Sequence, residues 1–258
     1  MTDNPFDIDY VDPAHDDFLE DFGWEDSAKK ADDSPIYHPQ IIQGSDEWLQ
    51  LRCGILTASE MKKILTPTLK TANNGETRVH AYELAFQRIS QHVEPQYVSD
   101  AMLRGQEDEI YARAEYSEHY APVTEMGFVT SHNLGFMIGY SPDGLVGDDG
   151  LIEAKSRAGK YQVQTIATDE VPEEYMLQLQ TGLLVTGRKW IDFISYSGGL
   201  PMFVKRVEPI AEIQEAIVRA ACEFEVKIQD VIREYNATLA RMPKIINTER
   251  RVYQEIVI

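Results

Sequence analysis

The stretch from residue 141 to residue 155 constrains the fold more than any other part of this sequence. It begins with Ser-Pro-Asp-Gly at residues 141–144, where proline presets the backbone of the second turn position and glycine closes the turn. Residues 151–155, Leu-Ile-Glu-Ala-Lys, predict a short strand, in which alternate side chains point to the same side. Glu153 and Lys155 therefore share one face. With Asp143 from the turn, they place two carboxylates and an ammonium group at a sheet edge, which suits a hard divalent cation and a phosphate.

The same residues also fit an ordinary strand and turn. A Glu-x-Lys sequence is common on half-exposed strands, and Asp-Gly turns occur in most proteins. Taken alone, the stretch favours this ordinary interpretation. A functional site therefore needs support from other parts of the sequence.

Acidic residues are concentrated at the N-terminus. The chain has 258 residues and a formal net charge of −19. Residues 1–35 hold twelve acidic side chains and only two basic ones, Lys29 and Lys30. Because so polar a segment buries too little apolar surface to fold alone, we predict a disordered acidic tail. Its scattered aromatic residues fit a docking peptide, and a solubilising extension fits equally well. The charge of the rest of the chain argues against a basic-patch DNA binder but allows a local basic groove.

The sequence contains no features of a membrane or secreted protein. It has no apolar run of about 18 residues, so we expect no membrane span and no membrane partner. The residues Met1–Pro5 lack the basic and apolar regions of a signal peptide. Cys53 and Cys222 lie far apart and show no Cys-x-x-Cys spacing. We therefore predict a reduced, cytoplasmic setting and no cysteine-based zinc or iron–sulfur site.

Residues 36–258 are predicted to form a single α/β domain with a long C-terminal helix. The predicted helices begin near residues 45, 57, 78, 99, 172 and 209, and the predicted strands cover residues 123–130, 136–140, 151–155, 190–196 and 202–207. This order predicts a mixed central sheet flanked by helices. The last helix is amphipathic and should pack on the body of the domain.

Arg52 lies just before the helix expected at Thr57, whose Thr-Ala-Ser-Glu sequence resembles a capping box. The free N–H groups of a first helical turn, with the Ser59 hydroxyl and the Arg52 guanidinium, would bind a phosphate. The alternative is that Thr57 only caps the helix and Arg52 pairs with Glu47. The residues alone favour this alternative.

Two more helices carry polar residues that could belong to a site. The helix from residue 99 holds Glu109 next to two other acids at residues 107 and 108, and spacing does not choose among them. Gly105 in the interior of this helix costs about 1 kcal/mol and suggests a close approach to its backbone. Gln178 shares a helix face with Tyr175 and Gly182. Its amide could orient a phosphate, a water or the lysine, or it could be an exposed polar flank.

Four motifs combine these residues in one order. They are Gly-Ser-Asp-Glu-Trp-Leu-Gln-Leu-Arg with Leu-Thr-Ala-Ser-Glu (residues 44–60), Arg-Gly-x-x-x-Glu-x-x-Ala-Arg (104–113), Ser-Pro-Asp-Gly-Leu with Ile-Glu-Ala-Lys (141–155) and Glu-Tyr-Met-x-Gln-Leu-Gln (174–180). The chain resembles the YqaJ-type viral recombinases, relatives of the bacteriophage lambda exonuclease within the PD-(D/E)xK nuclease superfamily. The resemblance covers roughly residues 43–196. It implies a restriction-endonuclease-like fold.

The resemblance implies a role for each matched residue. It implies that Asp143, Glu153 and the Ala154 carbonyl bind Mg²⁺, and that Glu109 completes a second metal site or holds the attacking water. It also implies that Lys155 activates water or stabilises the phosphate, and that Gln178 positions the lysine or the water. The matched residues for the 5′-phosphate are Arg52, Ser59 and Ser141.

The implied function is a Mg²⁺-dependent 5′→3′ exonuclease, with two ions per site and Mn²⁺ as an alternative metal. It would resect double-stranded DNA ends to 3′ single strands for a single-strand annealing protein, in a bacterial host that carries a phage or prophage. The family also implies a homo-oligomer, a trimeric ring in the lambda exonuclease. The alternatives are an endonuclease of the same superfamily and a catalytically silent binding module. Retention of every matched acid and of the lysine speaks against the silent module, and two cysteines cannot supply the four-cysteine cluster of a Cas4-like nuclease.

Overall fold

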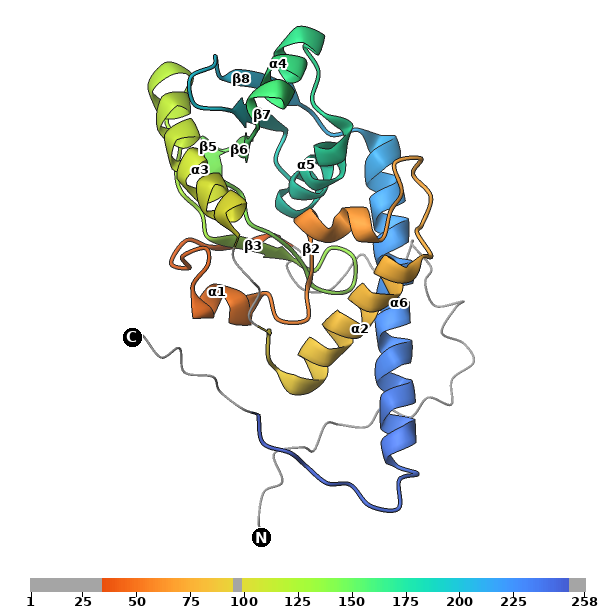
Figure 1. The fold of residues 1–258 in the computed structure, drawn as a ribbon. Coiled ribbons are helices and arrows are strands. Elements are labelled where there is room, and N and C mark those ends of the chain that lie inside the picture. Colours follow the sequence, from red (N-terminus) through yellow and green to blue (C-terminus); the bar gives the residue numbers. More distant parts are fainter. Residues whose placement is uncertain (1–33, 95–98, 251–258) are drawn as a thin grey trace, which may run out of the picture. The chain divides into compact units, whose positions relative to one another are not determined.

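The strands form two four-stranded sheets, and each contains parallel and antiparallel neighbours (Figure 1). This computed structural model describes residues 34–94 and 99–250, so the predicted acidic tail lies almost entirely outside the described residues. The first sheet has the order β1-β3-β4-β2, with β1 Ile36–His38, β3 Phe128–Ser131, β4 Ile138–Tyr140 and β2 Leu56–Thr57. The second has the order β5-β6-β7-β8, with β5 Gly144–Val146, β6 Gly150–Ser156, β7 Trp190–Tyr196 and β8 Phe203–Val207.

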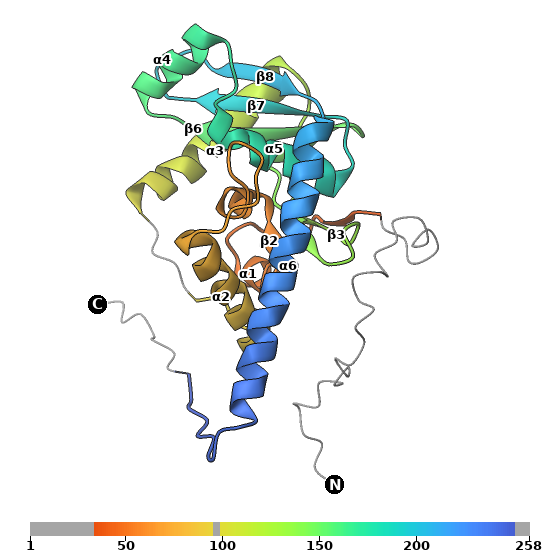
Figure 2. The same cartoon turned by 90° about the vertical axis from the view of Figure 1, so that its right-hand side faces the viewer.

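Helices pack on both sheets and join them. They are α1 Asp46–Leu51, the 3-10 helix η1 Ala58–Lys63, α2 Gly75–Ser90, α3 Asp100–His119, α4 Gly159–Thr168, α5 Glu173–Thr186 and α6 Ala211–Leu239. Helix α3 packs on β6 and β7, and α4 packs on β7 and β8. Helix α5 contacts strands of both sheets, and α6 runs alongside α2 and α5 (Figure 2).

The alternation of side chains along β6 gives its two faces different roles. On one face, Ile152 and Ala154 belong to an apolar cluster with residues of α3. On the other face, Leu151 packs with residues of α5 in the larger core. Glu153 and Lys155 share the face of Leu151, because alternate side chains of a strand point the same way. The spacing of the sequence predicted this arrangement.

The predicted fold class is confirmed, because the structure is a mixed α/β fold in which helices flank mixed sheets. The bounds of β7 match the predicted strand 190–196. Ser45 and Ser99 cap α1 and α3, each accepting a hydrogen bond from a backbone N–H of the first turn. Gly187 ends α5 in the left-handed conformation that suits glycine.

Several elements were not predicted. The expected single sheet is divided in two, and β1, β2, β5 and α4 were missed. Three of these are strands of two or three residues, too short to show a periodic pattern. The helix expected at Thr57 is the six-residue η1, and the Thr57 side chain makes no capping hydrogen bond there.

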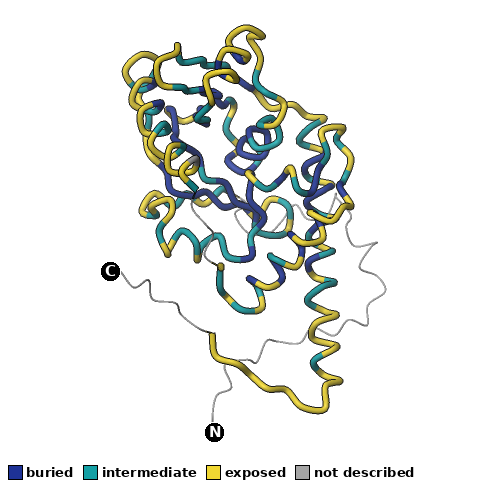
Figure 3. The backbone as a smooth tube through the Cα atoms, viewed as in Figure 1, coloured by how far each residue is buried: buried dark blue, intermediate teal, exposed yellow. Residues whose placement is uncertain are grey.

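Buried residues are concentrated in the strands, in α5 and on the facing sides of α2 and α6 (Figure 3). The described residues cluster as one compact unit. Within the described part of the chain, none of the helices has both the length and the apolar character needed to cross a bilayer.

Candidate active site

Glu153 is the centre of a buried polar cluster, with only 1% of its surface exposed. Its Oε1 accepts hydrogen bonds from Lys155 Nζ and from Gln178 Nε2, both at 2.6 Å. Its Oε2 accepts a hydrogen bond from the Tyr140 hydroxyl, also at 2.6 Å. Residues of β6, α5 and β4 therefore converge on one carboxylate. Gln178 contacts the acid rather than extending into solvent.

Asp143 lies in the turn between β4 and β5 and is also buried. Its Oδ2 accepts a hydrogen bond from the backbone N–H of Ala154 at 2.6 Å. Burial, together with the nearby negative charges of Glu153 and Glu109, raises the pKa of Asp143 well above its ordinary value, although Lys155 opposes the shift. The site therefore holds more negative charge than its one lysine balances.

Glu109 reaches this cluster from α3. Its Oε1 accepts a hydrogen bond from Arg113 Nη1 at 3.0 Å, and the same nitrogen donates to the Asp143 carbonyl at 3.1 Å. Burial raises the pKa of Glu109, Arg113 lowers it, and the repulsion from Glu153 adds to the net upward shift. Arg113 thus ties Glu109 to the turn that carries Asp143.

The other two acids of α3 have different surroundings. Glu107 is exposed, and Asp108 accepts a hydrogen bond from the Ser156 hydroxyl. The close approach expected at Gly105 is absent from the described part of the chain, because nothing lies within 4 Å of where its Cβ would stand.

Lys155 is partly buried beside Glu153. Burial lowers the pKa of its ammonium group, but Glu153 and Asp143 outweigh burial and hold that pKa above its ordinary value. The ammonium nitrogen lies 5.7 Å from the centre of the Tyr175 ring, within the range of a cation–π contact. Lys155 is therefore a fixed positive charge.

Arg52 follows the last residue of α1 and stacks on the Trp48 ring, with its Cζ 4.0 Å from the ring centre. Its Nη2 donates to the Thr57 hydroxyl at 3.3 Å. Among the residues that the structure describes, no carboxylate oxygen lies within 4.0 Å of its guanidinium, so the pairing with Glu47 is not formed. Burial lowers the pKa of Arg52 and Glu60 opposes the shift. Within the described ranges, Arg52 is therefore a partly buried cation without a direct ionic partner.

The two serines predicted to bind phosphate, Ser141 and Ser59, each lie beside a residue that contacts Arg52. Ser141 Oγ accepts a hydrogen bond from Trp48 Nε1 at 2.9 Å, so the tryptophan that stacks on Arg52 also contacts Ser141. Ser59 is exposed, with its hydroxyl 3.4 Å from that of Thr57. The helix that was expected to offer free N–H groups to the anion is the six-residue 3-10 helix η1.

A cleft of about 770 Å³ joins the two groups. Its lining includes Arg52, Trp48 and Thr57, and also Asp143 and Glu109. An arginine, which suits a phosphate, and acids, which suit a metal ion, thus line one cleft.

Comparisons with known proteins identify the family. The sequence matches the YqaJ-like viral recombinase domain over residues 47–189, more than half of the chain. This chain belongs to that family. The structure is similar to an alkaline exonuclease, LHK-Exo, from Laribacter hongkongensis, with 34% identity and a TM-score of 0.63 over 75% of this chain and 100% of that one.

Two further solved structures extend this result. The LHK-Exo complex with dAMP gives 35% identity and a TM-score of 0.64, with the same coverage of 75% and 100%. A phage-related exonuclease from Haemophilus somnus 129PT shares the fold, at 13% identity and a TM-score of 0.51 over 70% of this chain and 96% of that one. The comparison with curated proteins gave no match. The YqaJ-type family and these exonucleases identify the chain as a nuclease that acts on DNA.

The acids fit the divalent metal that a YqaJ-type nuclease suggests. Asp143, Glu153 and Glu109 could supply hard oxygen ligands. Burial raises the pKa values of Asp143 and Glu109, and repulsion between neighbouring acids, which a cation would relieve, adds to both shifts. Among the described residues, the one group of three His, Cys, Asp or Glu side chains whose ligand atoms lie within 4.8 Å of one another is a different one, Glu60, His80 and Glu83. The three predicted acids form a looser set.

Sequence reasoning assigned no role to several residues of this site. Trp48 lies four residues before Arg52 on the same helix face, and this spacing could have revealed it. Tyr140, which binds Glu153, gave no signal because it reads as an ordinary strand residue. Arg113 lies one helical turn after Glu109, which marks a helical pair but not its contact with the Asp143 carbonyl.

Proposed function

We propose that this chain is a Mg²⁺-dependent 5′→3′ exonuclease that resects double-stranded DNA ends and leaves 3′ single strands for annealing-type recombination. One observation carries the proposal. Arg52, a cation without a carboxylate partner among the described residues, lines the same cleft as Asp143 and Glu109. A site that only bound a metal would not need such a cation.

The metal ligands in this proposal are Asp143, Glu153, Glu109 and the backbone carbonyl of Ala154, which together would hold one or two Mg²⁺ ions, or Mn²⁺ in their place. When bound, the metal lowers the pKa of a coordinated water and offsets charge on the attacked phosphate. Tyr140 and Gln178 fix the Glu153 carboxylate from two sides. That support holds a ligand in place before the metal arrives.

Lys155 supplies a positive charge at the scissile phosphate in this proposal. A fixed ammonium in a buried site stabilises the charge that develops on the phosphate in the transition state. Its hydrogen bond to Glu153 and its contact with Tyr175 limit its motion. Gln178 keeps the same carboxylate turned toward the lysine.

The terminal 5′-phosphate would bind to Arg52, Ser59 and Ser141. A guanidinium fork offers several donors to phosphate oxygens, and the two hydroxyls add further donors. Holding the 5′-terminal phosphate beside the acids sets which end is digested. A similar exonuclease has been crystallised with dAMP, a nucleoside monophosphate, the class of product that stepwise digestion releases.

The partners in this proposal follow from its chemistry. Resection gives a 3′ single strand, so a single-strand annealing protein would act next, in the cytoplasm of a bacterial host that carries a phage or prophage. A ring-shaped homotrimer, the arrangement that the lambda exonuclease resemblance implies, would keep the enzyme on its substrate.

Digestion of defined duplexes tests the proposal. We expect linear DNA with 5′-phosphorylated ends to release 5′-mononucleotides in Mg²⁺ and none in EDTA, and circular duplex DNA to stay intact. Arg52→Ala should slow digestion of 5′-phosphorylated ends by about tenfold to a hundredfold, as expected for the loss of a charge-assisted contact of about 1.5–3 kcal/mol. Ends with a 5′-hydroxyl should be affected much less.

Three outcomes would contradict the proposal. Cleavage of circular DNA would indicate the endonuclease alternative. DNA binding without release of nucleotides would indicate the silent module. If Arg52→Ala slows digestion of 5′-phosphorylated and 5′-hydroxyl ends equally, Arg52 does not bind the 5′-terminal phosphate.

A further inference from the structure

Arg52 is connected to the partly buried carboxylate of Glu60 through one hydroxyl. Its Nη2 donates to Thr57 Oγ1 at 3.3 Å, and Thr57 Oγ1 donates to Glu60 Oε2 at 3.1 Å. Thr57 is only 2% exposed, so bulk water does not replace these contacts. The three side chains form a relay from the cleft wall into η1.

The relay differs in one respect from a direct ion pair. A carboxylate paired with arginine takes two parallel N–H donors, the same donors that bind a phosphate. The Thr57 hydroxyl takes a single nitrogen, so the rest of the guanidinium fork stays available. The Glu60 charge still acts on Arg52, because it opposes the lowering of the Arg52 pKa by burial. Arg52 is thus oriented by Thr57 while the rest of its guanidinium fork stays available to a phosphate.

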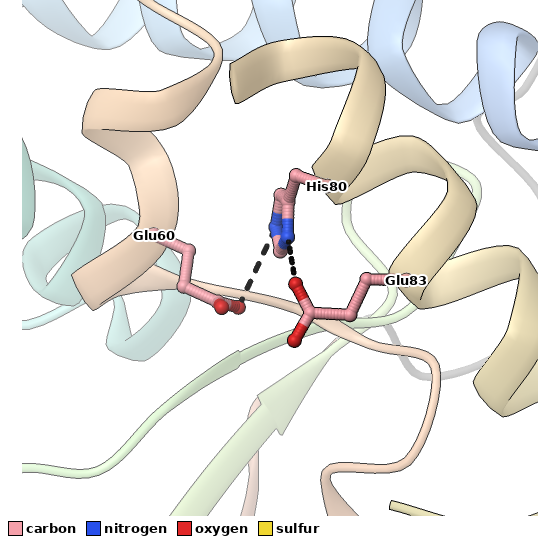
Figure 4. A group of neighbouring side chains, drawn as sticks. All are labelled: Glu60, His80 and Glu83. Atoms are coloured by element: carbon pink, nitrogen blue, oxygen red, sulfur yellow. Dashed lines mark hydrogen bonds and ion pairs between the residues drawn. The ribbon is translucent and has the colours of Figure 1, made fainter. Parts of the chain in front are cut away.

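Glu60 is in turn held by a second set of contacts (Figure 4). Lys63 Nζ donates to Glu60 Oε1 at 3.0 Å, and His80 Nε2 lies 3.6 Å from Glu60 Oε2. His80 is 1% exposed, and its Nδ1 donates to Glu83 Oε2 at 2.9 Å. Burial raises the pKa of Glu60, but His80, Lys63 and Arg52 outweigh burial and lower it. Glu60 therefore stays ionised.

The His80 ring is fixed from the side of α6 as well. It stacks on Phe224, with ring centres 5.3 Å apart and planes inclined by 12°. The position of Glu60 is thereby linked to the packing of α2 on α6.

A metal ion explains this cluster less well than an ion-pair network. Glu60 and Glu83 face different nitrogens of the His80 ring, whereas a single ion binds only one of them. Lys63 Nζ already lies 3.0 Å from Glu60 and 3.7 Å from Glu83. The positive charge between the two carboxylates is thus supplied by the chain itself.

We propose that Thr57 and Glu60 are positioning residues that orient Arg52 for the 5′-terminal phosphate, and that His80 fixes Glu60 in this role. This inference rests on the proposed function, in which Arg52 binds that phosphate. It adds residues on β2, η1 and α2 that determine how strongly the enzyme prefers a phosphorylated end.

The test compares Thr57→Val, which removes the hydroxyl, with Thr57→Ser, which keeps it. The readout is the ratio of kcat/KM for 5′-phosphorylated ends to kcat/KM for 5′-hydroxyl ends. We expect Thr57→Val to lower this ratio by about threefold to tenfold, as for the loss of one hydrogen bond, mainly by raising KM for the phosphorylated end. Thr57→Ser should keep the wild-type ratio. Glu60→Gln and His80→Asn should lower it in the same direction.

Thr165→Val is the matched control. Thr165 is also buried and loses one hydroxyl hydrogen bond, to the Tyr161 carbonyl, but it lies on α4 and does not line the cleft. The control should keep the wild-type ratio. Melting temperatures of all variants separate loss of folding from loss of preference, and Glu60→Gln replaces Thr57→Val if that variant does not fold.

The relay is wrong if Thr57→Val keeps the wild-type ratio, if Thr57→Ser fails to keep it, or if Thr165→Val lowers it equally. Metal that is bound to the purified wild type and lost in His80→Asn would also overturn the ion-pair network. Failure of the proposed function looks different, because the wild type and Arg52→Ala would then show the same preference. If Arg52→Ala loses the preference and Thr57→Val keeps it, only the relay fails.

Discussion

Two buried aspartates of the second sheet region are expected to respond in opposite ways to the same substitution. Asp143 and Asp192 are 7% and 3% exposed. Asp192 accepts hydrogen bonds from the Tyr116 hydroxyl at 2.6 Å and from Arg206 Nε and Nη2 at 2.8 and 2.9 Å. Asp143 accepts one from the Ala154 N–H, and burial together with repulsion from nearby acids raises its pKa. Asparagine at each position therefore tests whether the candidate site stores electrostatic strain.

In metal-free protein, Asp143→Asn should raise the melting temperature and Asp192→Asn should lower it. Asparagine at 143 keeps an oxygen for the Ala154 N–H and removes a charge, a relief of about 0.5–2 kcal/mol for a strained functional site. At about 2–4 °C per kcal/mol for a domain of this size, the gain is about 1–8 °C. Asparagine at 192 weakens hydrogen bonds to a charged group, at a cost of about 1.5–3 kcal/mol and hence about 3–12 °C.

The increase in melting temperature caused by Asp143→Asn should depend on pH. The folded protein raises the pKa of Asp143 above its ordinary value of 3.8, so it binds this proton more tightly than the unfolded chain does. The stability contributed by that proton is present below 3.8 and is lost as the pH rises through the folded value. The advantage of Asp143→Asn should therefore be largest at neutral pH and disappear as the pH falls through that window.

Thermal unfolding in EDTA across this pH range measures both effects. Addition of Mg²⁺ at about 100 times its Kd should stabilise the wild type by about 2.7 kcal/mol, or about 5–11 °C, and Asp143→Asn far less. Asp143→Asn should also abolish nuclease activity. A lower melting temperature for Asp143→Asn in EDTA at neutral pH, or an equal Mg²⁺ response in both proteins, would refute the reasoning.

Two further predictions concern residues that support the site or the packing of its helices. Gly182→Ala places a Cβ 2.8 Å from the Tyr140 ring, so the ring that holds Glu153 must shift. We expect the free energy of unfolding in urea to fall by about 1–3 kcal/mol and turnover to decrease. Unchanged turnover would show that the Tyr140 contact is dispensable. Glu225→Gln disrupts the double hydrogen bond by which Arg88 of α2 contacts α6. Because both side chains are partly exposed, we expect the free energy of unfolding to fall by about 1 kcal/mol, and by less in high salt. Equal losses at low and high salt would argue against an electrostatic origin.

The candidate site could be predicted in part because its central residues are close in sequence. Glu153 and Lys155 share a face by the alternation of one strand, and Asp143 lies in the turn before β5. The role of Arg52 was harder to predict, because the residues alone favoured an ion pair with Glu47 that the described structure does not contain. In the structure Arg52 contacts the Trp48 ring and the Thr57 hydroxyl instead.

Short elements were missed for a related reason. Strands β1, β2 and β5 have two or three residues, so their existence depends on partner strands rather than on a periodic pattern. The division of the strands into two sheets is likewise a matter of pairing. Helix α5, which contacts both sheets, was predicted as a helix, but its position between them was not.

The sequence by itself determined the family, the mixed α/β class and the set of chemical groups, because motifs, periodicity and turn residues are local properties. The tertiary structure decided which groups meet. It placed Gln178 and Tyr140 on the two oxygens of Glu153, and it placed Arg52 in the cleft that Asp143 lines. Such contacts join residues distant in sequence. They form only when burial of the apolar faces of helices and strands has fixed how those elements pack.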